Sequence, residues 1–224
     1  MKQSAKSRLL LARHAQSVWN AEGRWQGWSD APLSALGAEQ AHMAGKALAA
    51  AGVQPALVAS SDLVRASRTA QIIADELGYS GEMVLDADLR EQDLGDWNGL
   101  TRDEIVRRWP SEFEARRQGN LGTVPGGETG RHFRERCRAA LERLAARGAT
   151  ETIVVAHGGV VIAVECVLGT WVADAHHGNL SGWWLEARGS GAEAELVPLG
   201  RVDLLSEPVF VPSPATPETV TGTA

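Results

Sequence analysis

The stretch TIVVAHGG, residues 152–159, sets the fold class that the sequence predicts. Residues 152–156 form a short apolar run rich in β-branched side chains, which is typical of a buried strand. His157 and two glycines follow, and the apolar pattern over 160–168 predicts a helix directly after them. Glycines let the backbone approach a ligand closely, and the first amides of a helix can bind an anion. The stretch therefore predicts a strand, a loop and a helix that share an anion site.

The same alternation of strand and helix continues on both sides of this unit. Apolar runs predict strands at 8–12, 56–60 and 83–86, and helical periodicity predicts helices at 34–51, 62–77, 101–110 and 133–148. A closing antiparallel pair is expected at 180–187 and 195–199. This order predicts an α/β fold, a three-layer α/β/α sandwich with a mostly parallel central sheet. Ligands of such sheets bind at the carboxyl ends of the strands.

Length and composition predict one domain with a short tail. The chain has 224 residues, of which 44% are hydrophobic, enough for the core of a single domain over residues 1–210. After Phe210 the apolar pattern gives way to Pro, Thr and Ser, so a disordered tail is expected over residues 211–224. Cys137 and Cys166 fall in apolar helical segments and are expected to be buried, reduced thiols.

Charge and hydropathy narrow the classes of partner. A net charge of −6 and a pI near 5.5 argue against a nucleic-acid partner. No signal peptide is visible and no stretch approaches the roughly 20 apolar residues that span a bilayer, so a cytoplasmic location without a membrane partner is expected. The amphipathic helices are compatible with a homodimer. The basic residues are 19 arginines and 3 lysines, and the planar guanidinium group suits phosphate.

Residues with catalytic chemistry gather where the predicted strands end. His14 follows the first strand, directly after Arg13, and Arg65 lies in the first turn of the helix that follows the second strand. The acidic residues of the segment 89–99 lie among apolar residues and glycines, an environment that can raise the pKa of a carboxyl group. Taken singly, each feature has an ordinary explanation as a structural histidine, a solvated surface arginine or an acidic surface loop.

Taken together, these segments resemble the histidine phosphatase superfamily, in the branch related to cofactor-dependent phosphoglycerate mutase. The matching segments are RHAQSVWN at 13–20, GWSDAPLSALGAEQA at 27–41, SSDLVRASRTAQ at 60–71, LREQDLGDWNGLT at 89–101, PGGET at 125–129 and VVAHGG at 154–159. They follow the family's order and spacing. The resemblance implies that residues 1–210 form a histidine phosphatase domain.

The resemblance also implies a role for each catalytic residue. His14 would attack phosphorus and form a phosphohistidine that water hydrolyses. Arg13, Arg65 and His157 would surround the phosphoryl oxygens and stabilise their charge. Glu91 would protonate the leaving alkoxide and then accept a proton from the attacking water. The substrate-binding residues would be Asn20, Gln26, Gly27 and Gly158, and no cofactor or metal ion is implied.

Some residues depart from the family pattern or lie outside it. Ala15 stands where the family usually has glycine, and alanine suits this position if its backbone φ is negative. Trp25 and Trp28, between the first strand and the first helix, are candidates for a wall of the pocket, and core positions remain the alternative. The other histidines have no metal-ligand spacing and are expected at surface or capping positions; they are His42, His132, His176 and His177.

The sequence thus predicts hydrolysis of a small phosphate monoester, a sugar phosphate or a phosphoglycerate derivative, through phosphohistidine. Two alternatives remain: a cofactor-dependent phosphoglycerate mutase, and a non-catalytic protein that binds a phosphorylated ligand. Mutases of the family carry a long insertion after the catalytic-acid segment. Here only about thirty residues separate Gly99 from Gly130, a length expected to be too short for a lid over the pocket. The intact set of catalytic residues argues against a non-catalytic protein.

Overall fold

The computed structural model describes residues 7–118, 124–172, 177–188, 195–206 and 208–212. Within these residues one sheet contains β1 (Ser7–Arg13), β2 (Leu57–Ser60), β3 (Val84–Leu85), β4 (Glu151–Ala156), β5 (Ser181–Arg188) and β6 (Glu195–Asp203). The α-helices are α1 (Val18–Ala21), α2 (Ala35–Ala50), α3 (Val64–Glu76), α4 (Arg102–Arg108), α5 (Pro110–Arg117), α6 (Gly130–Ala145) and α7 (Gly158–Leu168). Short 3-10 turns at Ala87–Leu89 and Gly95–Trp97 connect β3 to α4.

The strands lie in the order β3-β2-β4-β1-β5-β6. β1 to β4 run parallel to one another, whereas β5 and β6 are antiparallel additions at one edge. Ile153 of β4 pairs with Leu10 of β1 on one side and Val58 of β2 on the other. The expected mostly parallel sheet with a closing antiparallel pair is therefore confirmed.

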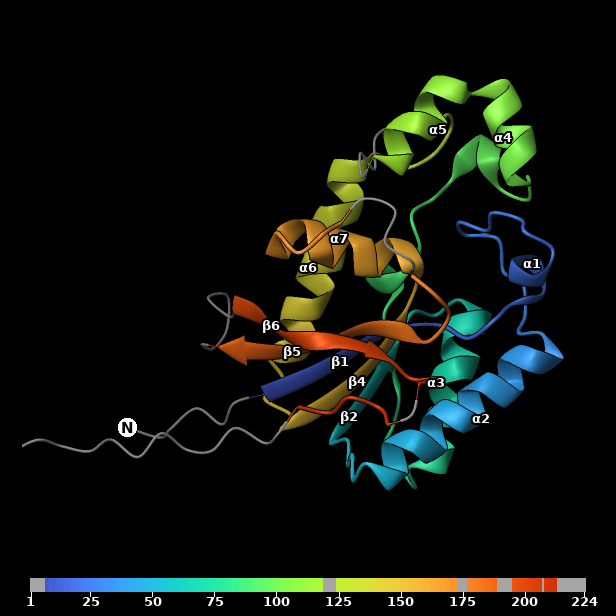
Figure 1. Cartoon of the computed structure of the whole chain (residues 1–224). Helices are drawn as coiled ribbons and strands as arrows, with labels where there is room; N and C mark the ends of the chain where they lie inside the picture. The colour runs from blue at the N-terminus through green and yellow to red at the C-terminus, as the bar shows by residue number, and fades with distance from the viewer. Residues whose placement is uncertain (1–6, 119–123, 173–176, 189–194, 207, 213–224) are drawn as a thin grey trace, which may run out of the picture.

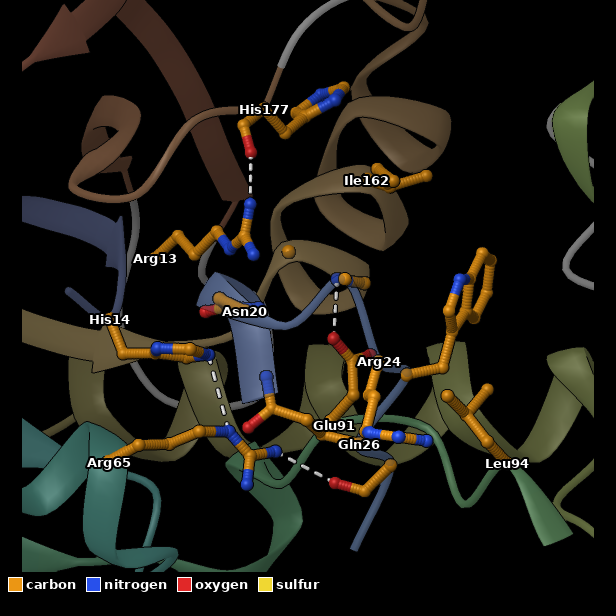
Figure 2. A pocket seen from close by; sticks show the side chains of 15 residues that line it. Arg13, His14, Asn20, Arg24, Gln26, Arg65, Glu91, Leu94, Ile162 and His177 are labelled. Carbon is orange, nitrogen blue, oxygen red and sulfur yellow. Dashed lines mark hydrogen bonds between the residues drawn. The ribbon is translucent and has the colours of Figure 1, made fainter. Parts of the chain in front are cut away.

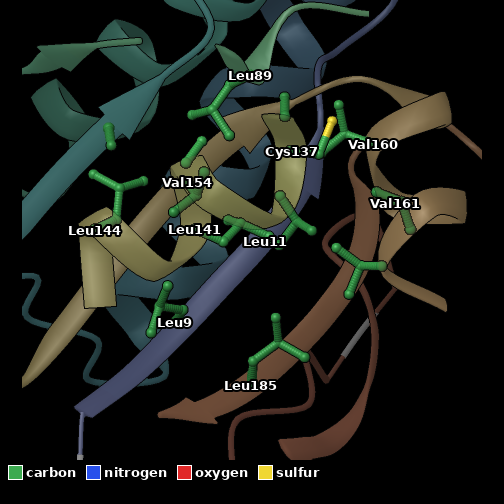
Figure 3. Close-up of a cluster of buried hydrophobic side chains, with 14 of the residues drawn as sticks. Leu9, Leu11, Leu89, Cys137, Leu141, Leu144, Val154, Val160, Val161 and Leu185 are labelled. Carbon is green, nitrogen blue, oxygen red and sulfur yellow. The ribbon is translucent and has the colours of Figure 1, made fainter. Parts of the chain in front are cut away.

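Helices cover both faces of the sheet, as Figure 1 shows: α2 and α3 lie on one face, and α6 and α7 lie on the other. Successive residues of a strand point to opposite faces, so Leu9 and Leu11 pack beneath α6 and α7 (Figure 3), while Leu10 packs beneath α2 and α3. The three-layer α/β/α sandwich is confirmed. Its two buried faces form the hydrophobic core.

The structure differs from the expected elements in three places. Pro110 was expected to end a helix, but it begins α5, because proline suits the first position of a helix. α1 is a single turn that Ser17 starts with a capping box. β6 extends to Asp203 rather than 199, through residues of which only Val202 is buried, and this gives a weak strand signal.

A segment after β6 packs back on the sheet. The carbonyl oxygen of Phe210 accepts a hydrogen bond from Trp184 Nε1 at 3.0 Å, and Arg8 donates to the carbonyl oxygen of Pro212. Val209 and Val211 contact the core beneath α2 and α3. Ordered packing thus continues to residue 212, and the rest of the expected tail lies outside the described residues.

Cysteine and tryptophan positions agree largely with expectation. Cys137 is buried, Cys166 is partly exposed rather than buried, and both thiols are free. Trp97, Trp183 and Trp184 are core residues. In the part of the chain that the structure describes, no helix combines the length and apolar character needed to cross a membrane.

Candidate active site

A pocket of about 350 Å³ opens at the carboxyl ends of β1 and β4. All the predicted site residues except His157 line it, and Figure 2 shows their side chains converging from β1, the loop after it, α3, the segment before α4, and α7. The lining residues are Arg13, His14, Asn20, Gly23, Arg24, Trp25, Gln26, Gly27, Arg65, Glu91, Leu94, Gly158, Gly159, Ile162 and His177.

His14 follows directly on the last residue of β1, and only 3% of its surface is exposed. Its Nδ1 lies 2.7 Å from the carbonyl oxygen of Ala15. A carbonyl can only accept, so Nδ1 carries the hydrogen and Nε2 of the neutral ring keeps its lone pair. Burial, followed by the charges of Arg65 and Arg13, holds the pKa of His14 well below 6.5. The ring is therefore neutral near pH 7, and the lone pair on Nε2 is available for nucleophilic attack.

Arg65 lies beneath His14, in the first turn of α3. Its Nε donates to His14 Nε2 at 3.2 Å, and its two terminal nitrogens donate to the carbonyl oxygens of Ser29 and Gly27 at 2.8 Å each. Burial lowers the pKa of Arg65 to about 10, so it remains charged near pH 7. The side chain of Asp30 accepts from the amide of Val64 at 2.7 Å, a cap from another loop that anchors this helix end.

Arg13 reaches the pocket from the other side of His14, and its guanidinium donates to the carbonyl oxygen of His177 (Figure 2). His177 is in turn held by Glu165, a fully buried carboxylate of α7 at 2.7 Å from its Nε2. Glu165 also accepts a hydrogen bond from Trp183 Nε1 at 2.8 Å. The position of Arg13 is thus fixed by a buried polar network that reaches into α7.

His157 lies behind His14 and is fully buried. The centroids of the two rings are 5.1 Å apart, in an edge-to-face arrangement. Nε2 of His157 is 2.9 Å from Ser61 Oγ, whereas Nδ1 has no hydrogen-bond partner among the described residues. Burial, then the charges of Arg65, His14 and Arg13, holds the pKa of His157 well below 6.5. A buried ring nitrogen without a partner is a candidate contact for an incoming oxygen.

Glu91 enters the pocket opposite His14 from the turn that precedes α4 (Figure 2). Its Oε2 accepts a hydrogen bond from the amide of Gly159 at 3.0 Å, and its Oε1 accepts from the amide of Gln92 at 2.9 Å. A Cβ at position 159 would lie 2.0 Å from Glu91 Oε1. Glycine is therefore required at 159 for this approach of carboxylate and helix end.

The predicted substrate-binding residues form the rim. Asn20 lies in α1 and its Oδ1 accepts from Asn179 Nδ2 at 3.3 Å, while Gln26 Oε1 accepts from Ser17 Oγ at 2.8 Å. Gly27 has a φ of +47°, and its backbone packs against the segment that carries Leu94. These contacts fix the loop after β1 as one wall of the pocket.

Comparison with known proteins identifies the family. The model for the "Histidine phosphatase superfamily (branch 1)" matches residues 9–197. The chain belongs to the histidine phosphatase superfamily.

Relatives in this superfamily include phosphatases and mutases. Glucosyl-3-phosphoglycerate phosphatase of Mycolicibacterium vanbaalenii is 36% identical over 195 residues, which cover 81% of this chain and 84% of that protein. 2,3-bisphosphoglycerate-dependent phosphoglycerate mutase of Rhizobium rhizogenes is 42% identical over 123 residues, or 54% of this chain. That match spans 58% of the mutase's length.

Solved structures of histidine phosphatases share the fold. A mycobacterial glucosyl-3-phosphoglycerate phosphatase with bound VO3 matches with a TM-score of 0.71 at 32% identity, covering 86% of this chain and 96% of that one. YhfR of Bacillus stearothermophilus matches with a TM-score of 0.75 at 30% identity, covering 89% and 100% of the two chains.

The structure accommodates the one departure from the histidine phosphatase pattern, and it separates the two tryptophans of the loop after β1. Ala15 has a negative φ and a fully buried side chain, so alanine fits without backbone strain. Trp25 lines the pocket, in agreement with one of the two alternatives for it. Trp28 is 42% exposed and is not among the lining residues; its Nε1 instead donates to the carbonyl oxygen of Glu91 at 2.8 Å.

The other histidines divide between surface and site. His42 and His132 are exposed, as expected, and each pairs with a carboxylate, whereas His176 lies outside the described residues. His177 was expected at the surface, but its side chain is only 10% exposed and lines the pocket. No group of three or more potential metal ligands occurs within the described ranges; that the reaction needs no metal stays a prediction.

Sequence reasoning also missed residues that depend on tertiary contacts. Arg24, Leu94 and Ile162 line the pocket, and Ser61 contacts His157. Ser61 and Leu94 lie in segments that resemble the family, and their position directly beside predicted site residues was the available signal. Ile162 lies one turn beyond Gly158 on α7, so helical periodicity alone could have placed it at the pocket.

Proposed function

We propose that this protein is a phosphohydrolase that cleaves small phosphate monoesters through a phosphohistidine at His14. One observation carries the proposal: a buried, neutral imidazole presents a lone pair on Nε2 beside the guanidinium of Arg65, in a pocket that a carboxylate enters from the opposite side. This arrangement supports nucleophilic attack on a phosphate dianion, which the arginines attract.

In the first step, His14 Nε2 forms a bond to phosphorus while the bond from phosphorus to the ester oxygen breaks. The carboxylic acid form of Glu91 gives its proton to the leaving alkoxide. In the second step, water attacks the phosphohistidine, its proton passes to the carboxylate of Glu91, and the nitrogen–phosphorus bond breaks. Inorganic phosphate leaves, and both side chains return to their starting states.

The arginines would stabilise the charge on the phosphoryl oxygens. Arg65 Nε now donates to the lone pair of His14, and a phosphoryl oxygen would take over this donor as the lone pair forms its new bond. Arg13 and His157 Nδ1 would contact the remaining oxygens. Donors fixed in advance by protein contacts are worth about 10²–10³ each in rate, because they need no reorganisation during reaction.

The leaving group would occupy the outer part of the pocket. Trp25, Leu94 and Ile162 give this part apolar surfaces, and Arg24 adds a cation. A sugar phosphate or a phosphoglycerate derivative has both apolar ring or chain atoms and polar groups that suit such a wall. The similarity to glucosyl-3-phosphoglycerate phosphatase supports this class of substrate.

A phosphoglycerate mutase is the second candidate, which the 42% identity to mutases favours. The segment between Gly99 and Gly130, expected to be too short for a lid, builds α4 and α5, and Phe113 of α5 contacts Trp25 at 5.9 Å between ring centroids. Glu91 and Trp25 nevertheless keep partly exposed surfaces. Water access of this kind favours hydrolysis of the phosphohistidine over its transfer to a second substrate.

Incubation with 3-phosphoglycerate and a trace of 2,3-bisphosphoglycerate separates the two candidates. We expect inorganic phosphate to be the main product. Formation of 2-phosphoglycerate faster than inorganic phosphate would identify a mutase.

The covalent intermediate is tested by trapping with labelled substrate at alkaline pH, where phosphohistidine survives. Label is expected on His14, and His14→Ala should abolish both labelling and hydrolysis of p-nitrophenyl phosphate. His42→Ala, a change at an exposed histidine, is the matched control and should retain both. Full hydrolysis by His14→Ala would refute the mechanism, and no turnover of any ester by the wild type would favour a non-catalytic phosphate-binding protein.

A further inference from the structure

A buried ion pair lies behind the segment that carries Glu91. Arg136 of α6 forms a bidentate ion pair with Glu128 of the PGGET segment. Its Nε donates to Oε1 at 2.7 Å and its Nη2 donates to Oε2 at 2.8 Å. Their side chains are 8% and 6% exposed. Neither residue lines the pocket, so any influence on the reaction must pass through other residues.

The remaining N–H groups of Arg136 donate to backbone carbonyl groups around Glu91. Nη1 donates to the carbonyl oxygens of Asp88 and Arg90 at 2.7 and 2.8 Å, and Nη2 donates to that of Glu91 at 2.8 Å. Only a planar guanidinium, with five donors in fixed directions, can bind a carboxylate and three carbonyl groups at once. A lysine would keep the charge and lose most of these contacts.

Glu128 holds the other end of the same segment. Its amide donates to the carbonyl oxygen of Asp93 at 3.0 Å, and its Oε2 lies 3.4 Å from the amide of Asp93. Its own carbonyl oxygen accepts from Gln92 Nε2 at 2.8 Å. The pair therefore holds the backbone on both sides of Glu91, from Asp88 to Asp93.

Proton transfer makes strict demands on the position of this carboxyl group. A general acid must come within about 2.6–3.2 Å of the oxygen that it protonates. The Glu91 side chain is fixed at two ends: its carboxylate is bound to the amide of Gly159, and its Cα is held by the backbone of its segment. The position of that backbone therefore decides where the carboxyl group lies. A small rotation of the segment 88–93 would pull the carboxyl group away from the ester oxygen without changing His14 or the arginines.

We propose that Glu128 and Arg136 are a positioning pair that holds Glu91 at the distance required for proton transfer. The pair thereby sets how well the enzyme cleaves esters with poor leaving groups. This inference rests on the proposed function, in which Glu91 protonates the leaving alkoxide. Esters whose leaving group departs without a proton, such as p-nitrophenyl phosphate, depend much less on the pair.

The test compares kcat/KM for an alkyl ester, β-glycerol phosphate, with that for p-nitrophenyl phosphate in Arg136→Lys and Glu128→Gln. General acid catalysis typically contributes about 10²–10⁴ in rate, so we expect at least about a tenfold loss on the alkyl ester. The loss on p-nitrophenyl phosphate should be several times smaller, and trapping should still give labelled His14 from that substrate. Glu91→Gln should show the same selective loss on the alkyl ester. In a protein that already carries Glu91→Gln, the further change Arg136→Lys should not increase that selectivity.

Arg143→Lys is the matched control. Arg143 also lies on α6 and binds the side chains of Asp86 and Asp88 at the surface, at 2.9 and 2.7 Å, rather than backbone carbonyl groups. We expect it to leave the ratio of the two substrates unchanged.

Three outcomes would overturn the proposal. Equal losses on both substrates would assign the pair to general stability, and unchanged activity would deny it any role. If neither variant folds, the pair is needed for the fold itself rather than for the placement of Glu91. Failure of the proposed function looks different, because the wild type would then form no phosphohistidine, or Glu91→Gln itself would not discriminate between the two esters.

Discussion

In the proposed mechanism, His14 can act as a nucleophile without a neighbouring base. A base is needed where the nucleophile must lose a proton, but the Nδ1 hydrogen of His14 is engaged by the carbonyl oxygen of Ala15, and Nε2 already has its lone pair. Burial and two arginines keep the ring from taking up a second proton. The same charges that disfavour a protonated ring favour a phosphate dianion, so one arrangement serves both requirements.

The two buried histidines predict how stability depends on pH. In the unfolded chain, His14 and His157 take up protons near pH 6.5, whereas in the folded protein they remain neutral to much lower pH. Below pH 6.5 the unfolded state therefore binds more protons. The free energy of unfolding should fall by up to about 1.4 kcal/mol per pH unit for each histidine.

Urea unfolding between pH 7.5 and 5 measures this dependence. His14→Asn should show a shallower loss of stability with falling pH than the wild type, because it lacks one of the titrating rings. Equal slopes in the two proteins would mean that His14 titrates in the folded protein as it does in the unfolded chain.

The buried methyl group of Ala15 is expected to contribute to stability. Its side chain is fully buried and its backbone needs no positive φ. Ala15→Gly would remove a buried methyl group and increase the freedom of the unfolded chain, so we expect a loss of about 1 to 2 kcal/mol in the free energy of unfolding. The turnover of p-nitrophenyl phosphate should stay close to that of the wild type. A large loss of turnover would show that the alanine shapes the pocket.

The first turn of α7 contributes both to the pocket and to the position of Glu91. Gly158 lines the pocket, and the amide of Gly159 binds Glu91. The two glycines therefore meet different requirements. A Cβ at 158 would make an ordinary contact with Arg13 Cδ at 3.6 Å, whereas a Cβ at 159 would collide with Glu91.

Substitution of each glycine by alanine should separate these requirements. Gly159→Ala would displace the carboxylate and is expected to remove most of the general acid contribution, typically about 10²–10⁴ in rate on alkyl phosphates. Gly158→Ala should cost less on the same substrates, measured as kcat/KM. The reverse order of losses would show that the phosphate, rather than Glu91, requires glycine here.

Most elements could be predicted because their apolar periodicity was clear. The apolar runs over 8–12 and 152–156 depend only on local sequence, and both form strands that are buried on the two faces of the sheet. α5 was missed because Pro110 is an equally good signal for the end of one helix and the start of the next. Single turns such as α1 depend on one cap and carry little periodic signal.

The site could be predicted to the extent that its residues lie beside strand ends or motifs. The position of His14 and Arg65 at strand ends brought them to one edge of the sheet, and Glu91 required the family resemblance. His177 could not be found, because its place depends on Glu165, which the sequence shows only as one acidic residue in an apolar helix. Such long-range polar contacts leave no local pattern.

At the scale of the whole molecule, the segment 208–212 closes the face of the sheet at β1 and β5. It covers Trp184, a fully buried side chain whose ring also lies 5.7 Å from the guanidinium carbon of Arg8. The first strand, the fifth strand and the end of the described chain are thus joined far from the pocket.

Shortening the chain tests how much the segment 208–212 contributes to the stability of the fold. A protein that ends at Ser206 would lose the bond from Trp184 to Phe210 and expose part of the indole, and we expect its Tm to fall by several degrees, since about 1 kcal/mol shifts Tm by about 2 to 8 °C. A protein that ends at Pro212 keeps these contacts and is the matched control. Equal Tm values for the two would show that residues 207–212 contribute no stability.

Helix α7 holds one partner of the reaction at each end: its first turn binds Glu91, and Glu165, near its other end, secures the carbonyl group that orients Arg13. In the proposed mechanism, any displacement of this helix would therefore affect proton transfer and phosphate binding together. A substitution in this helix that is made to change substrate preference would therefore also change turnover. Trp25 stands on the loop after β1, apart from this helix and from the segment of Glu91, so the choice of alcohol can be redesigned there with less effect on the phosphate chemistry.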